Sequence, residues 1–295
     1  MPKLWMRGYL LSTLILIAAT PACTATSGSA TAGQDAIDGG GDRLTDGGRV
    51  DADDTGIDAP AAPSLGDAYL VYYEDGGVFY PSAKARCNAP LSFGAWTSLL
   101  APTRLEIATA WPADLLAYRV VAIAGLGTTT SGRGLSSAQQ ASLDAWLKLG
   151  GTLLLITDYD FDSRQAIASR TANALLTSLT VGIQIDGPLA FNGFYDLRLD
   201  AKDPLANGVT ALHCGSTTAL TVTAPAAVLD ATPLAPGKAI LAAQRHGSGR
   251  VVVLADQTCA SDYTITSGSP PLYENCAVSK DSAASLKSFL QNLAR

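Results

Sequence analysis

The stretch LSSAQQASLDAWLKLGGTLLLITD, residues 135–158, contains a helix followed directly by a strand. Ser136 and Gln139 form a capping-box pattern, in which each side chain bonds to the backbone of the other residue. This pattern marks the start of a helix. The pair Gly150-Gly151 ends that helix, and Thr152–Thr157 continues as an unbroken apolar run typical of a strand covered on both faces. The helix buries an apolar stripe at helical spacing: Leu143, Trp146 and Leu147.

The same alternation of apolar strand and amphipathic helix extends along the chain on both sides of this stretch. Further buried strands are expected at Ala68–Tyr73, Val120–Ala124 and Val251–Ala255, and further helices at Asp162–Leu179 and Ser282–Leu293. The segment from residue 239 to residue 254 predicts a β-hairpin that turns at His246-Gly247-Ser248-Gly249. The pattern predicts an α/β fold with three α/β/α layers, a mostly parallel central sheet and a C-terminal β-hairpin.

The N-terminal residues have the features of an export signal. Lys3 and Arg7 precede an apolar run from Tyr9 to Ala19, which is shorter than the roughly 20 residues needed to cross a bilayer. We therefore expect residues 1–22 to be a signal peptide, and the protein to be exported to the bacterial cell envelope.

Cys23 follows this apolar run within the sequence Thr20-Pro21-Ala22-Cys23, which resembles the lipobox of bacterial lipoproteins. A lipobox usually has Leu where Thr20 stands, so cleavage by an ordinary signal peptidase is the alternative. The resemblance implies that Cys23 carries a lipid anchor that binds the protein to the membrane. The residue after the Cys is Thr24, where some Gram-negative lipoproteins have Asp. Under the sorting rule known for those bacteria, the absence of Asp predicts the outer membrane.

Residues 23–63 differ in composition from the rest of the chain. Eight Asp and two Arg lie among Ala, Gly, Ser and Thr, with few large apolar side chains. Such a segment buries too little surface to fold, so it predicts an extended acidic tether before a folded domain at 64–295. The whole chain has a formal charge of −6 and no Lys/Arg cluster, which argues against a nucleic-acid partner.

Several motifs within the expected domain resemble the class I glutamine amidotransferase-like superfamily. They are LAYRVVAIAG at 116–125, the stretch at 135–158, DPLANGV at 203–209 and GSGRVVVLAD at 247–256. In that superfamily the chain is most similar to non-catalytic extracytoplasmic members akin to domains associated with gliding-motility transporters. The resemblance implies a flavodoxin-like fold.

Catalytic members of the superfamily carry a Cys at the turn after a central strand, with a His nearby as its base. Here Thr152–Thr157 is followed by Asp158-Tyr159-Asp160, so we expect no catalytic residue of that type. The two histidines, His213 and His246, are interpreted as packing or surface residues, and no metal site is expected. Gly125-Leu126-Gly127 lacks the third Gly of a dinucleotide motif, so no nucleotide or other cofactor is expected.

Four cysteines follow Cys23, an even number in an exported domain, which indicates two disulfides. Three pairings are open. We expect Cys259–Cys276, which closes a Gly/Pro/Ser-rich loop, together with Cys87–Cys214, which joins two long loops.

Acidic residues follow several of the expected strands. Because ligands of open α/β sheets bind beyond the carboxyl ends of strands, a candidate ligand-binding rim is formed by Glu74, Asp75, Asp158, Tyr159 and Asp256. Asp is also common in such loops because it caps helices, and this alternative weighs about equally for Asp158 and Asp256 and more heavily for Asp160 and Asp162.

Two functions remain after these exclusions. The first is an envelope-tethered, non-enzymatic binding or scaffolding domain with a protein or carbohydrate partner. The second is a hydrolase that uses the carboxylates at the strand ends, with or without a metal ion. A separation of Asp158 and Asp256 beyond about 10 Å would rule out the carboxylate-pair form of the hydrolase, since paired catalytic carboxylates lie closer together than that.

Overall fold

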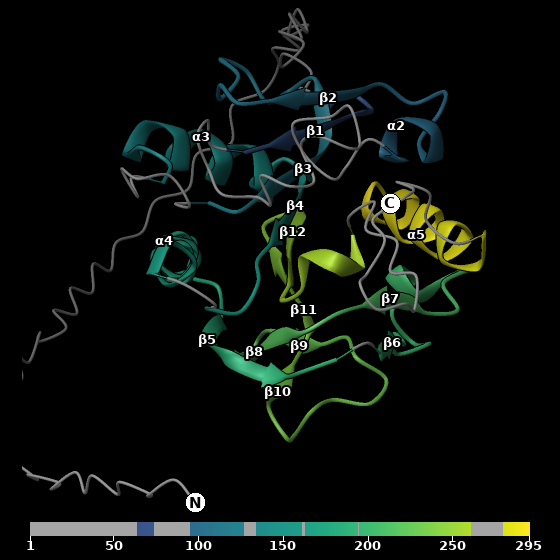
Figure 1. Cartoon of the computed structure of the whole chain (residues 1–295). Helices are drawn as coiled ribbons and strands as arrows, with labels where there is room; N and C mark the ends of the chain where they lie inside the picture. The colour runs from purple at the N-terminus through teal and green to yellow at the C-terminus, as the bar shows by residue number, and fades with distance from the viewer. Residues whose placement is uncertain (1–63, 74–94, 127–133, 161–162, 194, 261–279) are drawn as a thin grey trace, which may run out of the picture. The chain divides into compact units, whose positions relative to one another are not determined.

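A computed structural model describes residues 64–73, 95–126, 134–160, 163–193, 195–260 and 280–295 (Figure 1). Its largest element is a seven-stranded sheet with the strand order β2-β1-β3-β4-β12-β11-β9. The strands in that order are β2 (Leu105–Ala108), β1 (Ala68–Tyr72), β3 (Tyr118–Ala124), β4 (Thr152–Ile156), β12 (Gly249–Leu254), β11 (Leu241–His246) and β9 (Ala227–Val228).

The first five strands of this order are parallel to their neighbours, whereas β11 and β9 are antiparallel additions. Numbered along the chain, the parallel strands have the flavodoxin-like order 2-1-3-4-5. Every residue of β1 and β4 is buried, as expected for parallel strands covered by helices on both faces. The predicted mostly parallel sheet is therefore confirmed, and each of the four predicted central strands agrees with an observed strand to within two residues.

Helices cover both faces of the sheet. The helices α3 (Ser137–Lys148) and α4 (Ser163–Ser178) lie on one face, and α2 (Ala95–Leu99) and α5 (Lys280–Leu293) lie on the other (Figure 1). Buried side-chain hydrogen bonds join the layers: Trp146 Nε1 of α3 donates to the carbonyl of Tyr118 at 2.9 Å, and the Tyr69 hydroxyl of β1 donates to the carbonyl of Leu290 in α5 at 2.9 Å. The predicted three-layer α/β/α fold is confirmed.

The helix α3 begins as its sequence predicts. The Ser136 hydroxyl accepts the Gln139 N–H at 3.3 Å, and the Gln139 side chain accepts the Ser136 N–H at 2.7 Å, which completes the capping box. Gly151, just after the helix, lies directly under the Trp146 ring, and a Cβ there would fall 2.3 Å from a ring carbon. The helix end therefore requires a glycine because of this close approach.

The C-terminal hairpin is also confirmed. β11 and β12 pair antiparallel from Leu241↔Leu254 to His246↔Gly249. Gly247, with φ of +60°, occupies the left-handed conformation that such a two-residue turn requires. β12 then pairs with β4 in parallel, so the hairpin supplies the last strand of the parallel part of the sheet.

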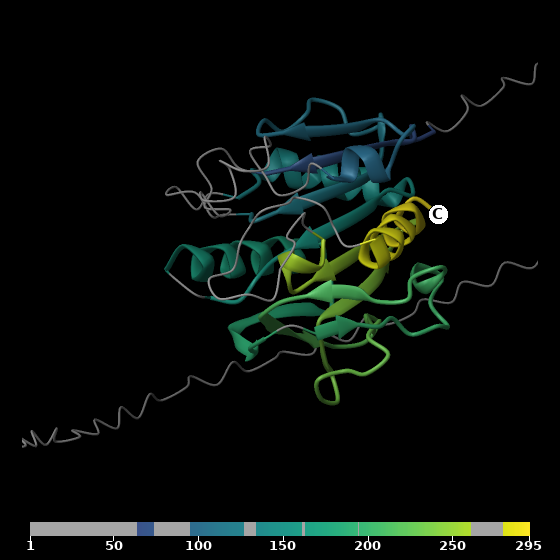
Figure 2. The same cartoon turned by 45° about the vertical axis from the view of Figure 1, so that its right-hand side comes forward.

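Two small sheets were not predicted (Figure 2). One contains β10 (Lys238–Ala239), β8 (Thr217–Val222) and β5 (Ile183–Phe191), and the other pairs β6 (Tyr195–Leu197) with β7 (Leu212–Cys214). Two 3-10 helices, η1 (Pro204–Ala206) and η2 (Gln257–Cys259), complete the described elements. These strands escaped prediction because they are short or contain Thr, Gly and Pro in place of an apolar run.

The longest of these strands, β5, lies at the edge of its sheet, and α4 packs against it. Asn173 of α4 bonds to both backbone groups of Ile185 in β5. Its Nδ2 donates to the Ile185 carbonyl at 2.9 Å, and its Oδ1 accepts the Ile185 N–H at 2.8 Å. A helix side chain thus takes the place of a neighbouring strand at this point.

The expected signal peptide, Cys23 and the acidic tether lie outside the described residues. Among the helices that the structure describes, none combines the length and apolar character needed to cross a bilayer.

Candidate functional site

The carboxyl ends of β4 and β12 place two aspartates side by side. β4 and β12 are paired in register up to Ile156↔Leu254, and the Thr157 N–H donates to the Leu254 carbonyl at 2.9 Å. Asp158 and Asp256 each follow two residues later. Continued along the ladder, this register brings the two residues beside each other on adjacent strands. Their carboxylates are close enough for the charge of Asp256 to raise the pKa of Asp158, which keeps the hydrolase alternative open.

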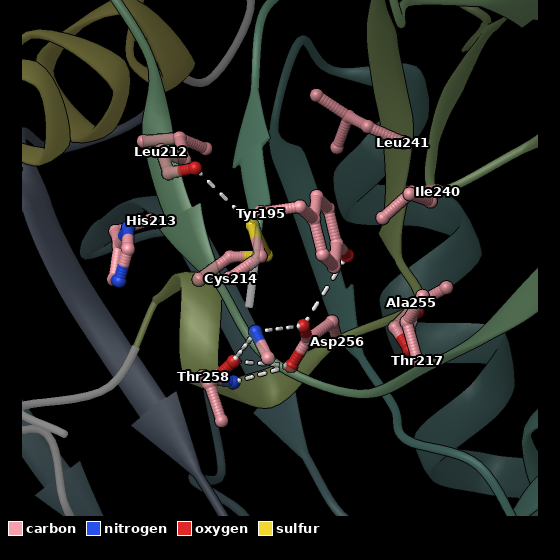
Figure 3. The surroundings of a disulfide bond; sticks show 12 residues. Tyr195, Leu212, His213, Cys214, Thr217, Ile240, Leu241, Ala255, Asp256 and Thr258 are labelled. Carbon is pink, nitrogen blue, oxygen red and sulfur yellow. Dashed lines mark hydrogen bonds between the residues drawn. A yellow bond between two sulfur atoms is a disulfide. The ribbon is translucent and has the colours of Figure 1, made fainter. Parts of the chain in front are cut away.

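Both carboxylates are buried, with exposed fractions of 1% for Asp158 and 0% for Asp256. The Asp256 carboxylate accepts four hydrogen bonds, which Figure 3 shows converging on its two oxygens. Their donors are the Gly215 N–H at 2.7 Å, the Thr258 N–H at 2.8 Å, the Thr258 hydroxyl at 2.6 Å and the Tyr195 hydroxyl at 3.2 Å. Asp256 is the N-cap residue of η2, so the capping alternative is correct for this residue.

Asp158 has fewer donors. Its carboxylate accepts the Tyr159 N–H at 2.8 Å, and the Gln257 side chain nearby favours its charged form. Burial, and next the neighbouring charge of Asp256, raise the pKa of Asp158 well above its ordinary value. Burial also raises the pKa of Asp256, although its bonds to Thr258, Gly215 and Tyr195 oppose that change. Because donors favour the charged form, the four hydrogen bonds of Asp256 favour its ionisation over that of Asp158.

Tyr195 connects this buried pair to the surface. Its hydroxyl donates to Asp256, and its ring contacts the ring of Phe191 edge to face at a centroid distance of 5.0 Å. The Phe191 side chain is 37% exposed. The pKa of Tyr195 is raised, first by burial and then by the charge of Asp256, so its hydroxyl stays protonated and remains a donor.

A disulfide lies directly beside the acid pair and joins Cys214 of β7 to Cys259 of η2, as Figure 3 shows. The expected pairings Cys259–Cys276 and Cys87–Cys214 are therefore wrong. The physical reason is that β7 crosses the carboxyl end of β12, which brings together two cysteines that are 45 residues apart in the sequence. Cys87 and Cys276 lie outside the described residues.

The disulfide holds the donors of Asp256 in place. Gly215 follows Cys214, and Thr258 precedes Cys259, so each half of the disulfide adjoins a residue that bonds to the Asp256 carboxylate. The Gly215 N–H also approaches the Thr258 hydroxyl. The two chain segments that surround Asp256 are thereby joined both covalently and through the carboxylate.

Cys214, Cys259 and Asp256 have ligand atoms within 4.8 Å of one another, which is the spacing of a metal centre. The two sulfurs are bonded to each other, however, and a metal ion requires free thiolates. In this oxidised state the cluster is a structural crosslink.

The other predicted site residues fall in different places. Glu74, Asp75 and Asp162 lie outside the described residues. Tyr159 is half-buried beside Asp158, and Asp160 accepts the Ser169 hydroxyl of α4 at 2.6 Å. The structure therefore brings Asp158, Tyr159 and Asp256 together.

Both histidines bond to an aspartate away from this pair. His246, the last residue of β11, bonds to Asp144 of α3 at 2.6 Å. The half-exposed ring of His213 in β7 lies 3.1 Å from Asp196 of β6. These contacts agree with the interpretation of both histidines as packing or surface residues, with His246 in a packing position and His213 at the surface.

The residues that surround Asp256 were not predicted from the sequence. Thr258 could have been recognised, since Asp followed two residues later by an N–H donor is an ordinary capping spacing. Tyr195 and Gly215 come from the unpredicted strand pair β6–β7 and its edge, so no local pattern pointed to them.

The fold and the acid pair define a flavodoxin-like α/β domain with two buried aspartates at the carboxyl ends of adjacent strands. The chain belongs to the family described as Domain of unknown function (DUF4350), whose model matches residues 89–269. No curated protein matches the chain.

Three solved structures are similar to the chain at low sequence identity. The structure titled mmIFT52 N-terminal domain is 15% identical, with a TM-score of 0.51 over 77% of this chain and 97% of that chain. Cytoplasmic Protein STM1381 from Salmonella typhimurium LT2 is 14% identical, with a TM-score of 0.47 over 77% of this chain and 99% of that one. Cytoplasmic Protein STM3548 from Salmonella typhimurium is 14% identical, with a TM-score of 0.45 over 77% and 97% of the two chains.

Proposed function

We propose that the protein is an envelope-tethered, non-enzymatic binding or scaffolding domain. The observation that carries this proposal is the state of Asp256 at the carboxyl edge of the sheet. This carboxylate is fully buried, and four protein donors already occupy its oxygens. A carboxylate engaged in this way stabilises the edge of the sheet and has no lone pair directed at a substrate.

We further propose that the fold is a degenerate form of the class I glutamine amidotransferase-like fold. The parallel strand order supports this relationship, and so does the position of Asp158 after β4, where a catalytic member would carry its nucleophile. In the part of the chain that the structure describes, the cysteines are Cys214 and Cys259, which are bonded to each other and cannot attack a carbonyl.

A screen of the purified protein against amide, ester and glycoside substrates tests the non-enzymatic role. We expect no turnover above that of an Asp158→Asn/Asp256→Asn control. Turnover that this control lacks would refute the proposal and would favour the alternative below.

The location rests on Cys23 and the acidic tether. We propose that Cys23 is lipidated and that residues 24–63 extend the domain away from an outer membrane. One thioether-linked diacylglycerol and an amide-linked acyl chain bind a membrane much more firmly than a single chain does. Cys23→Ser should therefore move the protein to the soluble fraction, whereas Thr24→Ser, as a matched control, should leave it on the membrane. Equal membrane retention of both variants would contradict the anchor.

A hydrolase that uses Asp158 and Asp256 is the second candidate. The pairing of a neutral acid with a carboxylate on adjacent strands favours it, because general acid–base catalysis needs these two protonation states close together. This candidate requires the rim around Tyr195 to open. A pH–rate profile that shows one raised pKa in the parent, and no such pKa in the Asp158→Asn variant, would support the hydrolase candidate.

A further inference from the structure

A second site is suggested at the opposite, amino-terminal edge of the sheet. A cavity of about 530 Å³ lies there, within the size range of small-molecule sites. Its walls come from the start of β4 and β12, from β11, and from the residues around η1 and after α5. β12 runs from this cavity to the acid pair, so the two places are at opposite ends of one strand.

Arginines dominate the charge of this cavity. Arg245, Arg250 and Arg295 line it, and Asp203 is the one acidic side chain among the lining residues. Asp203 is engaged as the N-cap of η1, where its carboxylate accepts the Leu205 N–H at 2.8 Å. The lining side chains therefore carry an excess of two positive charges.

Arg245 and Arg250 face each other directly. They are cross-strand partners in the antiparallel ladder of β11 and β12. Like charges placed opposite each other in a ladder destabilise the sheet. Among the described residues no carboxylate lies within ion-pair distance of Arg245, Arg250 or Arg295. The charge of Asp203 offsets the repulsion at Arg250 only from a longer distance.

The Arg250 side chain is held in place for binding. It is half-buried, and Nη2 donates to the carbonyl of Asn292 in α5. A guanidinium has five N–H donors in a fixed planar fork, so this anchor leaves donors for a ligand. Burial lowers the pKa of Arg250. The charge of Asp203 opposes that change and the charge of Arg245 adds to it, and an anion in the cavity would raise the pKa again.

We infer that this cavity binds the phosphate group of a small phosphorylated ligand between Arg245 and Arg250. Two guanidiniums match the two charges of a phosphate monoester, and the planar fork binds its oxygens in pairs. The cavity volume favours a compound of sugar-phosphate size over a polymer. This inference rests on the arginine cavity alone and does not depend on the envelope location proposed above.

Calorimetric titration of the purified protein with inorganic phosphate and with glycerol 3-phosphate tests the inference. We expect saturable binding that weakens as salt increases, and an Arg245→Gln variant about tenfold weaker than the parent. Arg104→Gln is the matched control, because Arg104 is an exposed arginine on the far side of the sheet and pairs with Glu106 at 2.9 Å. Its affinity should equal that of the parent.

A second readout separates a binding role from a structural one. Without phosphate, Arg245→Gln should be at least as heat-stable as the parent, because it removes the repulsion of Arg250. With phosphate, the parent should gain thermal stability and Arg245→Gln should gain less. Vesicles containing phosphatidylglycerol provide the other arm. Binding to vesicles but not to the soluble phosphates would assign the cavity to a lipid headgroup and overturn the small-ligand inference.

Two outcomes would refute the site altogether. One is the absence of saturable binding at phosphate concentrations up to about 10 mM. The other is an equal loss of affinity in Arg245→Gln and Arg104→Gln, which would show that binding follows net charge alone.

Discussion

The disulfide between Cys214 and Cys259 should contribute strongly to stability, and a Cys214→Ala/Cys259→Ala variant measures that contribution. The crosslink closes a loop with a sequence separation of 45 residues. In the chain-entropy model, closing a loop of this size lowers the entropy of the unfolded state. This raises the free energy of unfolding by about 4 kcal/mol at room temperature. For a domain of this size, that loss corresponds to a decrease in Tm of about 8–16 °C.

Urea unfolding followed by circular dichroism is the appropriate assay, with the parent protein measured oxidised and reduced. The reduced parent keeps its sulfurs in the core, so it separates the effect of the crosslink from the small cavity that alanine leaves. Both the variant and the reduced parent should unfold at lower urea concentration than the oxidised parent. A loss below about 1 kcal/mol in both would refute the loop-entropy argument. Peptide mapping that found Cys214 freely alkylated in the native exported protein would refute the crosslink itself.

Three further predictions concern single residues. Asp158→Asn should raise the free energy of unfolding at neutral pH, and this advantage should shrink as the pH falls toward the ordinary carboxyl value of 3.8, because above that pH the folded parent must hold a proton that the unfolded chain releases; an equal effect at neutral and acidic pH in urea titrations would contradict this. Gly151→Ala should destabilise by about 1–3 kcal/mol, because its Cβ meets the Trp146 ring; thermal unfolding unchanged from the parent would refute the contact. Ser136→Ala should cost about 1 kcal/mol through loss of the capping box, and Ser136→Asp should recover most of it in the same thermal assay.

The central sheet could be predicted because its signal is local. The apolar runs of β1, β3, β4 and β12 are buried on both faces, so nearly every residue in them is hydrophobic. The strand β5 gave no such signal, because it alternates between buried and exposed positions and contains Gly187-Pro188. Its pairing with β8 depends on tertiary contacts that a single sequence does not display.

The candidate site could be predicted in part. Because parallel strands end at one edge, the positions of Asp158 and Asp256 after two apolar runs sufficed to place them together. The sequence did not reveal that Asp256 is saturated by internal donors, since Gly215 and Tyr195 belong to strands that were not predicted. The cysteine pairing failed for the same reason: an even number of thiols indicates crosslinks but carries no information on which segments meet in space.

The contact between Asn173 and β5 has a consequence for how the protein behaves when it is crowded. A long edge strand with free backbone groups is a template on which another chain can add a strand and start aggregation. β5 is such an edge, and it exposes Leu189 and Phe191 by 45% and 37%. By occupying the N–H and the carbonyl of Ile185, the Asn173 amide interrupts the row of groups that an incoming strand would need. The Asp160 N–H donates to the Gly187 carbonyl of the same strand at 2.7 Å, so further along β5 another group that an incoming strand would need is already occupied.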